Sequence, residues 1–267
     1  MQDTKNTRQS VPNFTLNNGE AMSAIGLGCW MGRQGEGPHV TNTVRTALKL
    51  GYRHIDTAAN YGDEVSVGQG IGSALQPDES PTYIETWHLM QELLKTGKTK
   101  AIGVSNLSVE LLSSLLKDPR TTIIPAVNQV EAHPCLPQHE LLEFCRSKGI
   151  LLVAYSPVGK HKFGDDEDIL AIAQRLNVTS AQVMLSWGVQ RGTAVVPKSE
   201  HEERLAQNLS ILELSSADMQ VLDRLHLKPG MHRSVCGFHS LDLGGSCFGW
   251  SYKQLGWNFG PGGVICE

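Results

Sequence analysis

A regular alternation of short apolar runs with segments of helical periodicity is the feature that most constrains the fold of this chain. Six apolar runs predict strands, at residues 23–30, 52–58, 100–104, 125–130, 150–155 and 193–196. Strands separated by helices of this length form βαβ units, and continuous apolar runs are typical of parallel strands that are buried on both faces. The pattern therefore predicts an α/β protein built on a parallel sheet.

The segments between these runs predict helices, because their apolar residues recur every three or four positions. This periodicity is found at residues 40–48, 67–75, 84–94, 109–116, 139–148, 169–176, 181–189, 203–209 and 217–225. Gly51 and Gly97 follow two of these segments, as glycine commonly follows the last turn of a helix. No linker divides the chain, so we expect one domain over residues 1–267, with the glycine- and aromatic-rich tail from about residue 228 as a long surface arm.

One interval breaks the alternation. Between Leu75 and Tyr83 the chain passes from one predicted helix to the next through QPDESPT, with no apolar run between them. Elsewhere in the middle of the chain a predicted strand precedes each helix or pair of helices. The sequence thus indicates that strands are missing from the sheet at this point.

Charge and apolar content exclude several classes of protein. The chain has 23 basic and 27 acidic residues and a formal charge of −4, whereas nucleic-acid binding normally leaves a basic surface. The most apolar segment, Ile150–Val158, is too short to span a bilayer, and no basic amphipathic stretch predicts a membrane surface. The polar start of the sequence and its six scattered cysteines favour a cytoplasmic protein with reduced thiols. The oligomeric state is left open.

Polar residues gather just after the ends of the predicted strands. They are Asp56, Asn60, Tyr61, Ser105, Asn106, Gln129, Glu131, His133, Tyr155, Ser156, Lys198 and Ser199. In a parallel (β/α) barrel all these strand ends open onto one face, where such enzymes hold their reactive groups. Five successive sets of polar residues therefore predict a shared pocket.

Two familiar ligand motifs are not matched. Gly26-x-Gly28 and Gly68-x-Gly70-x-Gly72 lack the strand, turn and helix context of a dinucleotide-binding Rossmann domain. The segment HPCLPQH lacks the second pair of ligands that a structural zinc site needs. We therefore predict neither a Rossmann domain nor a metal site.

Five segments resemble the aldo-keto reductase family, in the family's order. They are GYRHIDTAANYGDE, KAIGVSN, PAVNQVEAHP, LLVAYSPVG and VPKSEHEERLAQN. The tail is similar to that of fungal members acting on small aldehydes. The resemblance implies a (β/α)8 barrel of the TIM type, which binds NADP(H) without a Rossmann domain and reversibly reduces small aldehydes or ketones to alcohols.

The resemblance also implies catalytic roles. Tyr61 matches the general acid that protonates the developing alkoxide, and Asp56 matches the carboxylate that holds a lysine beside it. A free phenol titrates near pH ~10, so it needs a neighbouring cation to act as an acid at neutral pH. Trp30 follows the first predicted strand and is expected to line the substrate mouth.

Further positions match the family's contacts to the cofactor. Ser105, Asn106 and Gln129 match residues that bind the nicotinamide carboxamide, and Tyr155 matches the aromatic residue that stacks on the ring. The remaining matches, to the pyrophosphate loop, the 2′-phosphate pocket and the adenine, are Ser156, Val158, Lys198, Ser199, Arg204, Gln207 and Asn208. Fixed positive charge with hydroxyl donors suits a phosphate, so NADP(H) is favoured.

The chain departs from the family where its alternation breaks. In the family the catalytic lysine and histidine follow the third and fourth barrel strands, and two βα units of roughly 30 residues each would fit between Leu75 and Tyr83. We therefore expect a barrel that lacks these two units, unpaired edges on the strands of Asp56 and Ser105, and low or no reductase activity. The alternatives are a relative that binds cofactor without turnover and a fragment without function.

Overall fold

The structure is a computed structural model, and it describes residues 11–30, 37–58, 61, 82–236, 239–240, 245–247 and 250–265. Its centre is formed by six parallel strands. They are β3 (Leu27–Gly28), β4 (Ile55–Asp56), β5 (Val104–Ser105), β6 (Val127–Glu131), β7 (Leu151–Tyr155) and β8 (Ala194–Val196). The strands follow six predicted apolar runs, although β3, β4 and β5 are shorter than predicted.

The order of these strands is that of an interrupted barrel. β5, β6, β7 and β8 are neighbours in one parallel sheet, and β3 pairs with β4. A parallel bridge between Ile25 and Val195 joins the two groups. The order is therefore β4-β3-β8-β7-β6-β5, in which the first and last strands of the chain's series are adjacent, as in a (β/α)8 barrel. Among the described residues no strand lies between β4 and β5, which leaves the barrel open where two units were expected to be missing.

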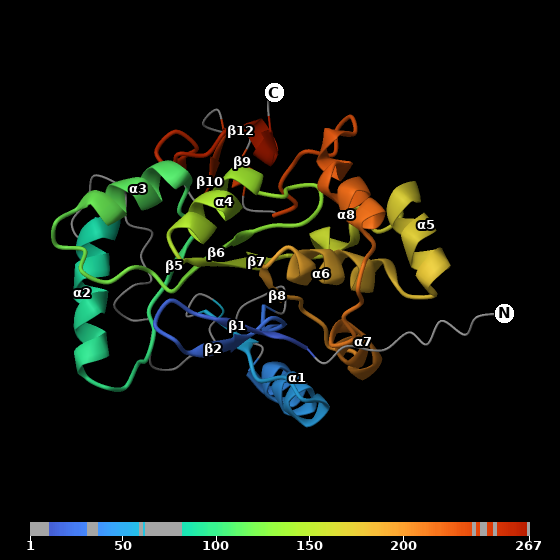
Figure 1. Cartoon of the computed structure of the whole chain (residues 1–267), viewed down its shortest axis with the longest axis horizontal. Coiled ribbons are helices and arrows are strands. Elements are labelled where there is room, and N and C mark those ends of the chain that lie inside the picture. The colour runs from blue at the N-terminus through green and yellow to red at the C-terminus, as the bar shows by residue number, and fades with distance from the viewer. Residues whose placement is uncertain are drawn as a thin grey trace.

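Helices surround the strands (Figure 1). They are α1 (Gly37–Leu50), α2 (Tyr83–Lys95), α3 (Val109–Lys117), α4 (His139–Ser147), α5 (Glu167–Leu176), α6 (Ser180–Gln190), α7 (Glu202–Asn208) and α8 (Ser216–Asp223), with short 3-10 helices at Gly159–His161, Leu225–Leu227 and Pro261–Gly263. These agree with eight of the predicted helices within a few residues. The helix predicted over 67–75 lies outside the described residues, as does Asn60.

Local sequence explains where α2 begins and ends. The Thr82 hydroxyl accepts from the backbone N–H of Glu85, and the Glu85 carboxylate accepts from the N–H of Thr82, which forms a capping box. After the last turn, Gly97 has a φ of +69°, a conformation that other residues rarely adopt. α2 is therefore a well-terminated helix directly after the break in the alternation.

Two tryptophans belong to the core. Trp87 and Trp187 are buried, and their indole N–H groups donate to the Ile123 carbonyl at 3.2 Å and the Asp223 carboxylate at 2.8 Å. Trp30 is 39% exposed instead. The N-terminal hairpin, β1 (Asn13–Thr15) and β2 (Ala21–Ser23), packs against the barrel strands.

The C-terminal tail differs from the expected surface arm. It forms β9 (His239–Ser240), β10 (Ser246–Cys247), β11 (Trp250–Ser251), β12 (Phe259–Gly260) and β13 (Val264–Ile265), all in antiparallel pairs. Ser234 and Val235 are each only 2% exposed, because they pack onto the end of β6. The tail is thus partly buried against the barrel.

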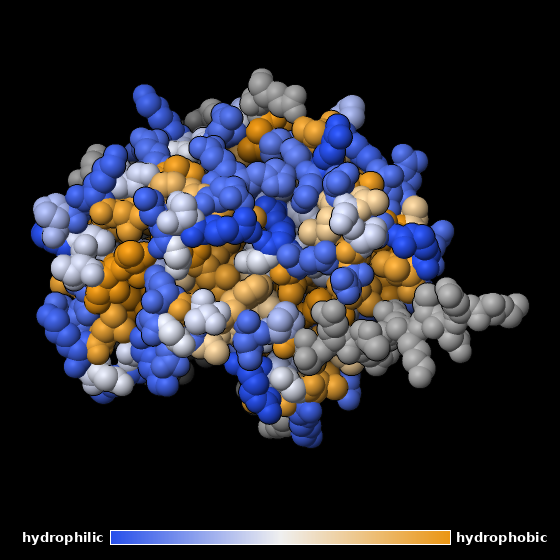
Figure 2. All heavy atoms as spheres, viewed as in Figure 1, coloured by the Kyte–Doolittle hydropathy of each residue, from blue (hydrophilic) through white to orange (hydrophobic). Residues whose placement is uncertain are grey.

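Apolar side chains are exposed at the end of the molecule that α2 occupies (Figure 2). Leu89 and Leu93 of this helix are 64% and 46% exposed. In a complete barrel a neighbouring helix would flank α2 on the side of the missing units. No helix in the described ranges has both the length and the apolar content needed to cross a bilayer.

Candidate active site

Asp56 and Gln129 meet at the carboxyl ends of two strands that are not neighbours. The Gln129 side-chain amide on β6 donates to the Asp56 carboxylate on β4 at 2.8 Å. Burial raises the pKa of Asp56, while the Gln129 amide and nearby His54 oppose this rise. Among the described residues, no lysine contributes to the pKa of Asp56. The carboxylate expected to hold a lysine is held instead by a neutral amide.

Tyr61 lies at the same end of the barrel. Its ring is 5.1 Å from the ring of Trp30, at an angle of 47°. Burial, followed by the charge of Asp56, raises the pKa of the phenol to about 12. Cys29 and Cys236 add to the rise, and no interaction among the described residues opposes it. The phenol is therefore a weaker acid than free tyrosine.

The four residues matched to the nicotinamide end are hydrogen-bonded to one another or to the tail. The Tyr155 hydroxyl donates to the Asn106 side-chain oxygen at 3.1 Å. The Ser105 hydroxyl donates to the backbone carbonyl of Gln129 at 2.8 Å. From the tail, the Trp257 indole donates to the Asn106 carbonyl at 3.3 Å. The structure thus brings Ser105, Asn106, Gln129 and Tyr155 together, with their polar groups already engaged.

The tail is attached to the barrel at Glu131, which the sequence placed among the strand-end polar residues without a specific role. This carboxylate is 5% exposed and accepts from the Val235 N–H at 2.7 Å and from the Ser234 hydroxyl. His133 lies 3.1 Å from it, and these contacts lower the pKa of Glu131 against the effect of burial. The only sequence feature that singled out Glu131 was its position at the end of a predicted strand. Nothing in the neighbouring sequence indicated a hydrogen-bond partner about a hundred residues later.

The same attachment brings Cys236 to the site. Its thiol hydrogen-bonds with Ser156, and it also interacts with the Tyr155 hydroxyl. Burial, and then the charge of Glu131, raises the pKa of the thiol, so it is neutral at physiological pH. Ser156 has a φ of +50°, which turns the chain sharply after β7. Val158 is half-buried and packs against two core clusters.

The residues matched to the adenosine end lie after β8 and on α7. The Lys198 ammonium is paired with the Glu200 carboxylate, and the Ser199 hydroxyl accepts from the His201 N–H at 3.2 Å. Arg204 is exposed on α7. Positive charge and a hydroxyl are therefore present in one loop and the helix after it.

The two remaining matched residues on α7 already have side-chain partners. Asn208 is buried, and its side chain hydrogen-bonds with the Tyr52 hydroxyl. The Gln207 amide donates to Glu203 at 3.4 Å. Asn208 thus ties α7 to the residues before β4.

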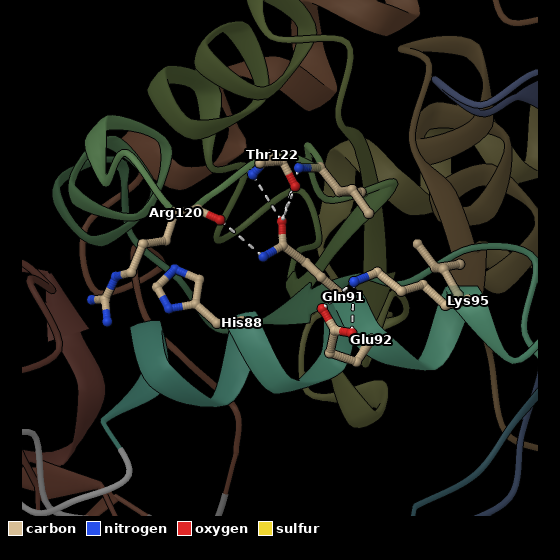
Figure 3. A pocket seen from close by; sticks show the side chains of 8 residues that line it. His88, Gln91, Glu92, Lys95, Arg120 and Thr122 are labelled. Atoms are coloured by element: carbon tan, nitrogen blue, oxygen red, sulfur yellow. Dashed lines mark hydrogen bonds and ion pairs between the residues drawn. The ribbon is translucent and has the colours of Figure 1, made fainter.

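A groove of about 680 Å³ lies elsewhere, between α2 and the segment around Arg120 (Figure 3). The Gln91 side chain lines this groove. Its amide oxygen accepts from the Thr122 N–H at 2.8 Å, and its amide nitrogen donates to the Arg120 carbonyl at 3.1 Å. A cavity of about 550 Å³ lies between the tail and the ends of β5 and β6, lined in part by Asn106, Glu131 and Trp257. In the described part of the chain, no three His, Cys, Asp or Glu side chains are grouped to hold a metal.

The chain is similar to aldo-keto reductases in sequence. The aldo/keto reductase family model matches residues 75–226. The chain is 36% identical to the glycerol 2-dehydrogenase (NADP(+)) of Saccharomyces cerevisiae, over 83% of this chain and 93% of that protein. It is 37% identical to the glyoxal reductase of Bacillus subtilis, over 79% and 91%. The alignment with the yeast protein spans 293 residues yet uses only 83% of this chain of 267, so the yeast protein has segments that this chain lacks.

Solved structures give the same result. An aldo-keto reductase of the silkworm Bombyx mori, complexed with NADPH, matches with a TM-score of 0.70 and 30% identity, over 81% of this chain and 88% of that one. An aldo/keto reductase from Brucella melitensis matches with a TM-score of 0.71 and 28% identity, over 81% and 100%. The interrupted barrel is thus superimposable on complete relatives over most of its length.

Proposed function

Because the chain belongs to the aldo/keto reductase family of oxidoreductases, we propose that it binds NADP(H) and reduces small aldehydes or ketones only slowly. The observation that carries this proposal is the environment of Tyr61. Its phenol has a raised pKa of about 12 and no cation among the described residues that would lower it. The relatives' names support the cofactor and the substrate class, since they include an NADP(+)-dependent dehydrogenase and a glyoxal reductase.

The adenosine end of the proposed cofactor site fits a 2′-phosphate. Lys198 and Arg204 supply two positive charges, and Ser199 supplies a hydroxyl. The Lys198 ammonium is paired with the Glu200 carboxylate. A bound phosphate would take the place of this carboxylate as the partner of Lys198. Both cations are solvent-accessible, which a diffusing anion requires.

At the nicotinamide end the groups expected to bind the carboxamide are already hydrogen-bonded within the chain. Gln129 and the side-chain oxygen of Asn106 are the groups that would meet the carboxamide, and they are bonded to Asp56 and Tyr155. When bound, the cofactor supplies a hydride to the carbonyl carbon. The chain's own part is to hold a carbonyl against the contacting pair of Trp30 and Tyr61 and to provide a proton from the Tyr61 hydroxyl.

The proton step accounts for the slow reaction. The charge of Asp56 stabilises the neutral phenol against the phenolate that forms when the proton leaves. A well-matched general acid contributes typically 10²–10⁴ in rate. We therefore expect most of that factor to be lost in this chain.

Titration and turnover on one sample test the proposal. Quenching of tryptophan fluorescence on addition of NADPH should saturate, and oxidation of NADPH with a reactive aldehyde should be slow but measurable. Binding without any turnover would favour a cofactor-binding relative that is no longer an enzyme. A folded sample without saturable quenching would contradict the cofactor assignment.

A further inference from the structure

Asp56 and Gln129 lie on strands at the open side of the barrel. β4 is one end of the strand order, and β6 is next to β5, which is the other end. The hydrogen bond between the two side chains therefore links strands on either side of the gap. The Gln129 amide therefore points to the Asp56 carboxylate, and not to a ligand.

We propose that this hydrogen bond closes the nicotinamide end of the site, so that the chain binds 2′-phosphorylated adenosine nucleotides about as tightly as NADP(H). This inference rests on the proposed function, because it takes the cofactor to lie along these strand ends. It narrows the ligand that the site recognises from the whole dinucleotide to its adenosine 2′-phosphate half.

The strength of the bond follows from the charge of its acceptor. Asp56 is half-buried and has no cation beside it among the described residues, so its carboxylate is stabilised by a hydrogen-bond donor. Hydrogen bonds to an ionised group are roughly twice as strong as those between neutral groups. The neutral carboxamide of a nicotinamide would therefore compete poorly with Asp56 for the Gln129 amide.

The second carboxamide partner is engaged from the other side. The side-chain oxygen of Asn106 accepts from Tyr155, and its backbone carbonyl accepts from Trp257 of the tail. Cys236 of the tail interacts with the Tyr155 hydroxyl and with Ser156, beside the residue expected to stack on the nicotinamide ring. A ring entering here would have to displace part of the tail as well as break the bond to Asp56.

The adenosine end lies on the intact side of the barrel. β8 pairs with β7 and is bridged to the segment before β3, so its environment does not depend on the missing strands. α7 is tied to the residues before β4 by the Tyr52 hydroxyl, which donates to the Leu205 carbonyl at 3.1 Å. Lys198, Ser199 and Arg204 thus lie after and beside strands that keep their neighbours, whereas the nicotinamide end faces the gap.

Isothermal titration calorimetry of the full chain with NADPH and with adenosine 2′,5′-bisphosphate tests the inference without any variant. The two dissociation constants should agree within about threefold. An NADPH constant more than tenfold tighter than that of the bisphosphate would overturn the inference but leave the proposed function standing. If neither ligand binds a folded sample, both are wrong.

A pair of substitutions at Asp56 separates the hydrogen bond from other causes. Asp56→Ala removes the acceptor and should tighten NADPH binding about three- to tenfold, the gain of one ordinary hydrogen bond, with no change for the bisphosphate. Asp56→Asn retains an oxygen at the same place without the charge and should give a smaller gain. Unchanged or weakened NADPH binding by a folded Asp56→Ala variant would contradict the inference.

Discussion

The Asp56 carboxylate lies close enough to the Tyr61 hydroxyl for its negative charge to raise the pKa of the phenol, which burial has already raised. Asp56 and Tyr61 match a catalytic pair of the family, but in this arrangement the charge of Asp56 makes it harder for the Tyr61 hydroxyl to give up its proton. The same carboxylate accepts the Gln129 amide, so one unneutralised charge affects both the proton donor and the cofactor site.

The raised pKa of Tyr61 predicts a loss of stability at alkaline pH. The pKa of the phenol is near 10 in the unfolded chain and about 12 in the folded chain, so the folded chain retains this proton to higher pH. Its contribution to the free energy of unfolding is complete below pH ~10 and is lost as the pH rises toward 12. Urea unfolding across this range should show a shallower loss for Tyr61→Phe than for the parent chain. Equal slopes would show that the phenol is not buried beside a carboxylate.

Removing the partner of Lys198 should strengthen binding of the 2′-phosphate. Glu200→Gln frees the Lys198 ammonium and removes a negative charge near the incoming phosphate. We expect about a two- to fivefold gain in affinity for adenosine 2′,5′-bisphosphate at low salt, the size of one exposed ion pair, and a smaller gain at high salt. Glu202→Gln is the matched control, because Glu202 is an exposed carboxylate in the first turn of the same helix, α7. Equal gains in both variants would indicate a general charge effect.

The capping box of α2 predicts a stability change directly after the break in the alternation. Thr82→Ala should lower the free energy of unfolding by about 1 kcal/mol, because it leaves the N–H of Glu85 without its acceptor. Thr179→Ala, at the capping box of α6, should cost a similar amount. Urea unfolding measures both. No loss for Thr82→Ala with the expected loss for Thr179→Ala would mean that α2 does not begin at Thr82.

Glu131 should hold the tail at neutral pH and release it only in acid. Its pKa is lowered in the folded chain, so its contribution to stability is present above the unfolded value of 4.5 and is lost as the pH falls through the lower folded value. Glu131→Ala leaves Ser234 and the Val235 N–H without their acceptor and should speed hydrogen exchange at Val235 at pH 7. Glu131→Gln keeps an acceptor and should speed it less. Unchanged protection in both variants would contradict the attachment.

Local patterns in the sequence predicted the helices and the positions of the strands well, because helical periodicity and apolar runs are properties of neighbouring residues. The prediction for 100–104 was less accurate, since β5 comprises only Val104–Ser105. Directly before this edge strand, Gly103 lies so close to Val127 that a Cβ on Gly103 would approach the Val127 side chain to 2.5 Å. Edge position and close backbone approach depend on the rest of the fold.

The candidate site was predictable in its members but not in its contacts. The strand-end pattern gave Asp56 and Gln129, 73 residues apart, yet nothing local indicates that they hydrogen-bond. The tail has no periodicity that would assign Val235 to the Glu131 carboxylate. These bonds depend on how segments far apart in the sequence pack together in the folded chain.

The turnover number at saturating NADPH, measured beside that of the Saccharomyces cerevisiae relative with the same aldehyde, tests the central claim most directly. Without a cation beside Tyr61, the turnover number of this chain should be lower by about 10²–10⁴, the usual contribution of a general acid. A turnover number within tenfold of the relative's would show that the phenol is an effective acid in this barrel and would contradict the account.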